Sequence, residues 1–187
     1  GDMSAADSIV LSITAMGDAA SPVRRSGAQA GDVVAIVGEL GMAGAGFGAL
    51  SRGFRSPKAA VDRHRVPEPP YAAGPQAAEA GATALVDVSD GLLVDLGHIA
   101  KASGVAIDLA SGAFEIPEAV QTVASALGGV GPLQFVLTGG DDYALAGTFP
   151  TGSVPAGWRT IGAVTTGTGI TVDGQPFEGA QGHTHWS

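Results

Sequence analysis

The chain has 187 residues, a length that suits one domain able to bury about 70% of its unfolded surface. Its 18 acidic residues outnumber its 9 basic ones, and the net charge of −9 argues against a nucleic-acid partner, which requires a basic surface. There is no cysteine for disulfide or thiolate chemistry, and apolar stretches such as Val33 to Val37 are too short to span a membrane. We therefore expect a cytoplasmic domain without a membrane or nucleic-acid partner.

The first third of the chain contains one predicted strand and several predicted helices. The strand covers Val33 to Val37, and a glycine-rich turn, residues 38–46, leads into a helix toward Arg52. That turn lacks the Gly-x-Gly-x-x-Gly order of dinucleotide-binding loops, so its glycines favour close helix packing over phosphate binding. Shorter helices are expected at Ser56 to Arg65 and Gln76 to Ala80.

The segment from Ala84 to Gly91 is the most informative part of the sequence. Its apolar residues predict a buried strand, in which Asp87 is a charge that is costly to bury unless something binds it. A helical pattern follows from Leu92, with Gly104 as its end and Ser89 or Asp90 as the expected N-cap. Carboxylates beside a helix N-terminus suit Mg²⁺ and phosphate. The alternative is a capped helix that follows a solvated strand end.

The remaining elements favour an α+β fold, in which helices pack on a mixed or antiparallel sheet. Strands are predicted at Val105 to Leu109, Arg159 to Thr165 and Gly169 to Val172, and a helix at Pro117 to Leu127 opens with proline. Asp173-Gly174 is a hairpin signal toward Phe177.

A second segment with paired acids, Leu137 to Tyr143, joins two apolar runs. It reads Leu-Thr-Gly-Gly-Asp-Asp-Tyr, and its adjacent Asp141 and Asp142 repel one another unless they are solvated or bound by cations. The alternative is an ordinary hairpin turn between two strands.

Taken together and in this order, the motifs resemble those of the thiamine-monophosphate kinase family. Aminoimidazole ribonucleotide synthetase and selenophosphate synthetase share the architecture but lack the same pairing of Ser-Asp-Gly-Leu with Gly-Gly-Asp-Asp-Tyr. The matching segments are Gly1-Asp2, Arg24 to Ala28, Gly31-Asp32, Arg63 to Pro69, Asp87 to Gly91, Asp95 to Ile99, Gly139 to Tyr143 and Gly182-His183.

The resemblance implies a set of metal and nucleotide ligands. Asp87 and Asp90 correspond to Mg²⁺ ligands, and Asp2 to a further metal ligand at the nucleotide. The implied ATP contacts are Gly1, Asp2, Arg25 and Ser89.

The resemblance also implies a pocket for thiamine monophosphate, with two departures from the family pattern. Asp141 stands where the family usually has a glutamate, so a moved loop, a bridging water or Asp142 would have to compensate for the shorter side chain. His183 stands where the family has a tyrosine or tryptophan that packs on the substrate. For the histidines, the alternatives are a solvated tail or a transition-metal site for His183 and His185, and a packing role or a general base for His98.

The family's N-terminal nucleotide-binding domain has no counterpart in this sequence. We therefore expect residues 1–18, with a strand at Ser8 to Ala15, to be a remnant of that domain, and residues 19–187 to form the C-terminal aminoimidazole ribonucleotide synthetase-like domain. Gly1-Asp2 could equally be a cloning remnant. The resemblance implies a homodimer when the first domain is present, and a fragment that is inactive alone.

The implied reaction is ATP-dependent, in-line phosphorylation of thiamine monophosphate to thiamine diphosphate with Mg²⁺. Because the acceptor is a phosphate with a second pKa of about 6, no catalytic general base is expected. The alternatives are another ATP-dependent enzyme of the superfamily, similar to aminoimidazole ribonucleotide synthetase, or a module that binds a phosphorylated ligand without turnover.

Overall fold

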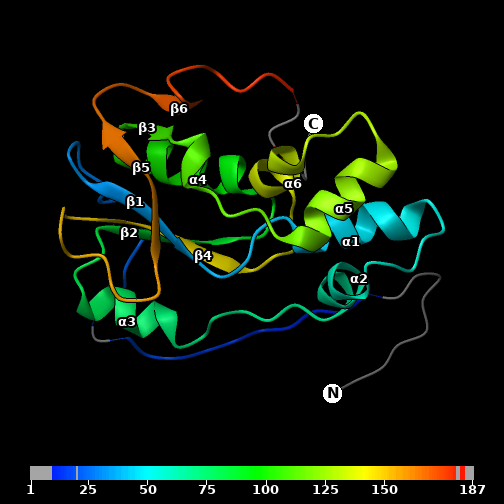
Figure 1. Ribbon diagram of the computed structural model, residues 1–187. Helices are drawn as coiled ribbons and strands as arrows, with labels where there is room; N and C mark the ends of the chain where they lie inside the picture. The colour runs from blue at the N-terminus through cyan, green and yellow to red at the C-terminus, as the bar shows by residue number, and fades with distance from the viewer. Residues whose placement is uncertain (1–9, 20, 180–181, 184–187) are drawn as a thin grey trace.

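A single mixed sheet with helices on both faces forms the framework of the chain (Figure 1). The computed structural model describes residues 10–19, 21–179 and 182–183. The elements in chain order are β1 (Val33–Val37), α1 (Met42–Ser51), α2 (Lys58–Arg65), α3 (Ala73–Glu79), β2 (Ala84–Val88), α4 (Leu92–Ser103), β3 (Ala106–Leu109), a short 3-10 helix (Ser111–Ala113), α5 (Glu118–Leu127), α6 (Pro132–Thr138), β4 (Ala144–Phe149), β5 (Arg159–Thr165) and β6 (Gly169–Val172).

The sheet has six strands in the order β2-β4-β1-β5-β3-β6. All neighbouring strands run antiparallel except β3 and β6, which are parallel. The predicted α+β class with a mixed sheet is therefore confirmed. At the end of β6, Val172 and Gln175 exchange backbone hydrogen bonds around Asp173-Gly174, so the predicted tight turn is present, but no further strand follows within the described residues.

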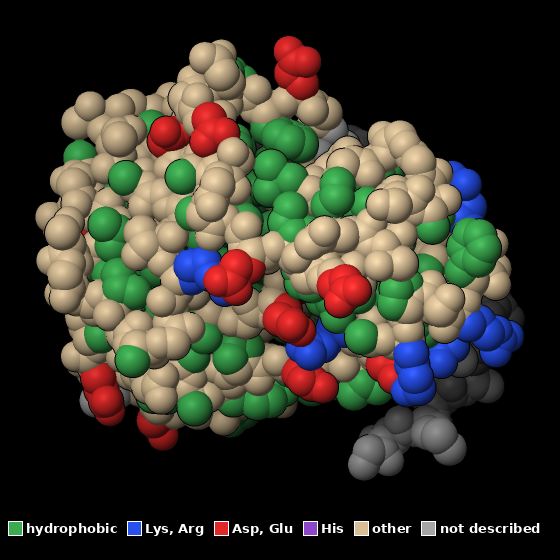
Figure 2. Space-filling model, viewed as in Figure 1, with side chains coloured by type: hydrophobic (Ala, Val, Ile, Leu, Met, Phe, Trp, Pro, Cys, Tyr) green, Lys and Arg blue, Asp and Glu red, His purple; other side chains and the backbone are tan. Residues whose placement is uncertain are grey.

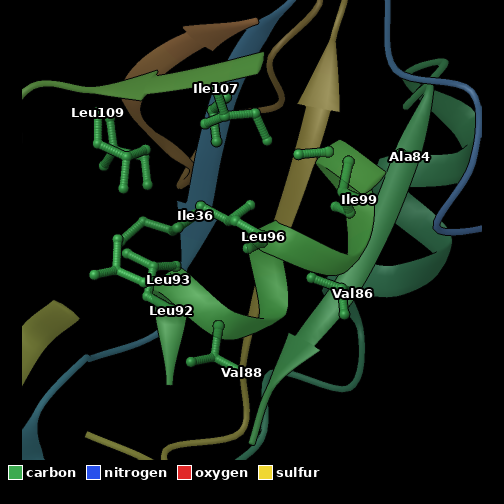
Figure 3. Packing of buried hydrophobic residues seen from close by; sticks show 14 of the residues in the cluster. Ile36, Ala84, Val86, Val88, Leu92, Leu93, Leu96, Ile99, Ile107 and Leu109 are labelled. Atoms are coloured by element: carbon green, nitrogen blue, oxygen red, sulfur yellow. The ribbon is translucent and has the colours of Figure 1, made fainter. Parts of the chain in front are cut away.

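Helix α4 covers one face of the sheet and α3 covers the other (Figure 1). Burial alternates along β2, so Ala84, Val86 and Val88 pack toward α4. Figure 3 shows Leu96 and Ile99 of α4 directed into the same core. On the α3 face, the buried residues are Ala35, Ala73, Ala77, Phe149 and Trp158.

Helices α1, α2, α5 and α6 gather beside the sheet and form a second apolar cluster (Figure 1). Helices α1 and α2 approach closely because Gly46 has no side chain. A Cβ at Gly46 would collide with the carbonyl oxygen of Ala60. The predicted close helix packing of the glycine-rich segment is therefore confirmed at this position.

The strand expected at Ser8 to Ala15 is not formed in the part that the structure describes. Residues 10–19 belong to no helix or strand and are exposed. A strand needs a neighbour to accept its ladder hydrogen bonds, and none of the described strands pairs with this segment.

The hairpin alternative for the Gly-Gly-Asp-Asp segment is wrong. The apolar run before it forms the helix α6, with Pro132 at its first turn, rather than a strand. A short, mostly apolar run does not distinguish a buried helix from a buried strand by periodicity.

No single helix in the described ranges has the length and apolar character needed to cross a bilayer. Helices α5 and α6 reach that length only as a pair, and they are bent by 112° relative to each other.

Candidate functional site

The two acidic segments of the sequence lie side by side at one edge of the sheet. Strand β2 ends where the antiparallel β4 begins, with Val88 opposite Ala144. Their pairing continues past the strands, because Tyr143 N donates to Val88 O at 2.8 Å and Asp141 N donates to Ser89 O at 2.9 Å. The loop of residues 139–143 is thus held directly against the Ser89–Asp90 turn.

The C-terminal segment also reaches this edge. His183 N donates to the carbonyl oxygen of Asp90 at 2.9 Å. Gly182 packs so closely on Asp90 that a Cβ there would collide with the same carbonyl. The structure therefore brings the backbone of His183 to the predicted site, whereas the residue itself is exposed. His185 lies outside the described residues.

The expected side-chain cap of α4 by Ser89 or Asp90 is wrong. The N-cap is Gly91, with φ 121° and no side-chain cap bond. The carboxylate of Asp95, in the first turn of the helix, instead accepts hydrogen bonds from the backbone N–H groups of Ser89, Asp90 and Gly91, at 2.9, 3.0 and 3.2 Å. In this reversed arrangement the cap comes from inside the helix, and the Ser89 and Asp90 side chains do not provide it.

Asp95 also changes what the helix N-terminus can bind. The amides of Ser89, Asp90 and Gly91, at the helix N-terminus predicted to bind phosphate, already donate to the Asp95 carboxylate. Asp95 is buried, and this burial raises the pKa of its carboxyl, with the charges of Asp90 and Asp87 acting in the same direction. A phosphate near Asp90 would meet three negative charges, which a cation would have to offset.

Asp87 and Asp90 supply the hard oxygen donors that Mg²⁺ prefers. Both residues are partly buried at the end of β2 and in the turn that follows it. Within the described ranges, no group of three His, Cys, Asp or Glu side chains is placed to hold a metal. Two carboxylates fit Mg²⁺ as it is bound beside nucleotides, where phosphates and waters complete its coordination.

Asp142 takes a different role from the adjacent Asp141. It is 4% exposed, and its carboxylate accepts hydrogen bonds from Gly41 N at 2.6 Å and Ala43 N at 2.9 Å. Burial raises the pKa of Asp142 to about 6, although these two bonds and the charge of Arg63 oppose the rise. Asp142 therefore caps α1 from outside the helix, and the alternative in which it replaces Asp141 at the substrate is wrong.

Asp141 and Tyr143 face outward on either side of that buried cap. Both residues are exposed, and both have a left-handed backbone, with φ 62° and 52°. Partial burial raises the pKa of Tyr143, and Asp141, Asp87 and Asp90 contribute to the rise. Sequence reasoning missed Asp95 and Tyr143 as members of this site. The signal for Asp95 was its position four residues after Gly91, and the signal for Tyr143 was its place in the Gly-Gly-Asp-Asp-Tyr motif.

Arg25 lies apart from this cluster. Arg24 O accepts a hydrogen bond from Leu85 N near the start of β2, and Arg25 O accepts one from Ser103 Oγ at the far end of α4. Leu92 and Ser103 lie at opposite ends of α4, an offset of eleven residues that corresponds to roughly 17 Å along the helix. Gly1 and Asp2 lie outside the described residues.

The basic residues are concentrated in one part of the chain. On the face that Figure 2 shows, most of the Lys and Arg side chains lie on the side of α1 and α2. Five of the nine basic residues belong to one short stretch, namely Arg52, Arg55, Lys58, Arg63 and Arg65. Arg63 is paired with Glu39 at 3.0 Å and with Glu68 at 3.1 Å.

Comparison with known proteins identifies relatives of the whole chain. Residues 29–137 match the family described as AIR synthase related protein, C-terminal domain. Thiamine-monophosphate kinase of Mycobacterium tuberculosis (strain H37Rv) is 48% identical over 185 residues, which are 97% of this chain and 55% of that protein. The corresponding enzyme of Methanopyrus kandleri is 36% identical over 179 residues, 94% of this chain and 58% of that protein. The chain thus spans about half the length of these relatives.

Solved structures share the fold. Thiamine monophosphate kinase from Aquifex aeolicus superposes with a TM-score of 0.77 at 31% identity, over 84% of this chain and 55% of that one. A structure described as AaThiL complexed with AMPPCP and TMP gives a TM-score of 0.78 at 31% identity, over 87% of this chain and 54% of that one.

Proposed function

This chain belongs to the AIR synthase related protein, C-terminal domain family, and on that premise we propose that it forms the acceptor-binding part of a kinase that phosphorylates thiamine monophosphate with ATP. The single observation that carries the proposal is the contact between residues 88–90 and residues 139–143, which joins the two acidic motifs into one site. The relatives named as thiamine-monophosphate kinases and the AMPPCP and TMP complex support the choice of reaction.

Asp87 and Asp90 would hold Mg²⁺ in this proposal, with Asp2 as a further ligand. The metal, when bound, would neutralise the charge of the reacting phosphates. Asp95 fixes the backbone of Ser89, Asp90 and Gly91, so the side chain of Asp90 is carried by a rigid turn.

Asp141 and His183 would bind the acceptor beside the Ser89–Asp90 turn. Asp141 is exposed and next to this turn, and His183 is anchored to Asp90 through its backbone. A carboxylate there suits the positively charged thiamine part of the acceptor, because an opposite charge at close range stabilises the bound state.

The chain's own residues bind and orient, and none is proposed as a catalytic acid or base. The acceptor phosphate is mostly deprotonated near pH 7, since its second pKa is about 6, so no side chain has to remove a proton before attack. An in-line approach of the two phosphates, with Ser89 as an ATP contact, would then suffice.

Most of the ATP-binding residues would lie outside the cluster of Asp87, Asp90 and Asp141. We propose residues 1–18 as part of a preceding ATP-binding domain, with Gly1, Asp2 and Arg25 as ATP contacts and residues 19–187 as the second domain. The active protein would be a cytoplasmic homodimer.

The direct test is turnover. The full-length protein should convert thiamine monophosphate to thiamine diphosphate when ATP and Mg²⁺ are both present, as followed by chromatography of the thiamine products. Omission of Mg²⁺ should abolish the reaction, and aminoimidazole ribonucleotide precursors should not be consumed. A protein that binds thiamine monophosphate but forms no diphosphate would favour the binding module instead.

A further inference from the structure

We propose that Asp142 is a positioning residue, which sets the acceptor pocket by tying the loop of residues 139–143 to the N-terminus of α1. This inference rests on the proposed function, because it assigns the loop to the acceptor side of that site. Asp142 itself is too buried to touch a substrate, at 4% exposure. Its influence would pass through the backbone to Asp141 and Tyr143.

Asp142 attaches the loop of residues 139–143 to the start of α1. The two bonds from Gly41 N and Ala43 N, at 2.6 and 2.9 Å, join segments about a hundred residues apart in the chain. Helix α1 has no acidic residue in its own first turn and no side-chain cap of its own. Asp142 therefore satisfies amides of this helix that would otherwise be buried without an acceptor.

The loop is packed tightly on both sides, against α1 and against the Ser89–Asp90 turn. On the α1 side, a Cβ at Gly44 would lie 3.1 Å from the Cα of Gly139. On the other side, a Cβ at Gly140 would lie 2.6 Å from Ser89 O. The loop is clamped between the helix and the Ser89–Asp90 turn, so displacement at α1 has to move the loop.

The backbone of the loop is strained on both sides of Asp142. Asp141 and Tyr143 have φ of 62° and 52°, a region that costs non-glycine residues roughly 1–3 kcal/mol each. Asp142 lies between them and is the side chain of the loop that is anchored in the core. Release of Asp142 would let both neighbours relax and would displace the Asp141 side chain.

Two substitutions test the clamp from opposite sides, in the full-length protein. Asp142→Asn keeps one acceptor oxygen but turns an N–H donor toward the second amide, so the loop should loosen. Gly44→Ala leaves the Asp142 carboxylate intact and presses on Gly139 from the helix. Each should raise KM for thiamine monophosphate on the order of tenfold, the scale of one lost cap, and leave KM for ATP within about twofold.

Two matched controls separate positioning from general loss of stability. Asp32 is also buried and accepts hydrogen bonds from Gln29 N and Thr83 Oγ1, but it precedes β1, roughly 17 Å along the strand from the site. Gly48→Ala makes the same change as Gly44→Ala one turn later, where the new Cβ meets the flexible end of Leu127. Asp32→Asn and Gly48→Ala should leave both KM values unchanged.

A second readout is independent of turnover. Amide hydrogen exchange of residues 139–143 should accelerate in Asp142→Asn and not in Asp32→Asn. Equal shifts in both KM values, unchanged kinetics in Asp142→Asn and Gly44→Ala, or unchanged exchange in the loop would overturn the inference. A wild-type protein that does not phosphorylate thiamine monophosphate would refute the proposed function, and the exchange measurement would still decide whether Asp142 holds the loop.

Discussion

Asp141 and Asp142 are neighbours in the chain with opposite environments. Asp141 is exposed beside the Ser89–Asp90 turn, whereas Asp142 is buried against the first amides of α1. Asp95 and Asp90 differ in the same way, since Asp95 is buried and binds three amides of the turn while Asp90 stays partly exposed. In both segments one carboxylate is buried against backbone amides and shapes the loop, and the other lies nearer the surface.

The metal role proposed for Asp90 gives the first prediction. Asp90→Asn in the full-length protein should lower kcat by at least ~100-fold, the scale of losing one preorganised electrostatic contact, and higher Mg²⁺ should restore part of the rate. Glu79→Gln, on α3 at the other face of the sheet, is the control and should have no effect. Normal turnover with unchanged Mg²⁺ dependence in Asp90→Asn would remove Asp90 from the metal site.

The acceptor role proposed for Asp141 predicts which of the two Michaelis constants should change. Asp141→Glu restores the longer acid of the family pattern and should change KM for thiamine monophosphate while KM for ATP stays nearly constant. The measurement is steady-state kinetics with each substrate varied in turn. Equal changes for both substrates would mean that Asp141 acts on the metal or nucleotide side.

Asp142 predicts a pH dependence of stability. Its pKa is raised from 3.8 to about 6 in the folded chain, so between these values the folded state binds the proton more strongly than the unfolded state. The free energy of unfolding should therefore fall by about 3 kcal/mol from this group as the pH rises from about 4 to about 6.

Urea titrations at a series of pH values measure this effect as a difference between two proteins. Asp142→Asn removes the titrating group, so the gap in unfolding free energy between wild type and variant should change across this interval and stay flat above about pH 7. A gap that is constant from pH 4 to pH 7 would contradict the raised pKa.

At the scale of elements, the packing of α1 against α2 depends on Gly46. A Cβ at this position would collide with the carbonyl oxygen of Ala60 in the backbone of α2, which has no flexible end to move aside. Gly46→Ala should therefore lower the free energy of unfolding by about 1–3 kcal/mol, the usual cost of overpacking.

The same substitution elsewhere in α1 should have the opposite sign. At Gly48 the new Cβ meets the side chain of Leu127, and the better helix propensity of alanine adds up to about 1 kcal/mol. Thermal unfolding of both variants checks the pair. A Gly46→Ala protein as stable as Gly48→Ala would show that α1 and α2 can move apart without cost.

At the scale of the whole molecule, the described residues contain the acidic edge and the loop of residues 139–143, but no nucleotide pocket is described among them. Two carboxylates bind Mg²⁺ weakly without phosphates, because this ion releases its waters reluctantly. Residues 1–187 alone should therefore bind ATP-Mg²⁺ poorly and form no thiamine diphosphate.

Val10, Leu11, Ile13 and Met16 are 80–92% exposed, so the isolated chain should also associate through this apolar segment. Purified residues 1–187, with the full-length protein as the positive control, can be tested by product analysis and by light scattering. Appreciable turnover by the chain alone would show that its catalytic apparatus is complete.

The local elements followed from the sequence because their signals lie within a few residues of one another. The apolar period after Leu92 predicted α4, and Gly104 ends it in a left-handed conformation with φ 69°. The strands at residues 159–165 and 169–172 and the turn at Asp173-Gly174 were predicted with the bounds that the structure has. The run before Gly139 was ambiguous, since a short apolar run fits a helix as well as a strand.

The sequence by itself determined the two acidic motifs and the elements that carry them, whereas only the tertiary structure decided which carboxylates are buried against backbone amides. Ser89 and Asp90 carry good capping side chains, yet Asp95 takes the amides, because the turn at Gly91 folds its carboxylate back over them. Asp142 meets Gly41 and Ala43 only after β4 pairs with β1 and β2. Such contacts depend on strand order and register, which local periodicity does not encode.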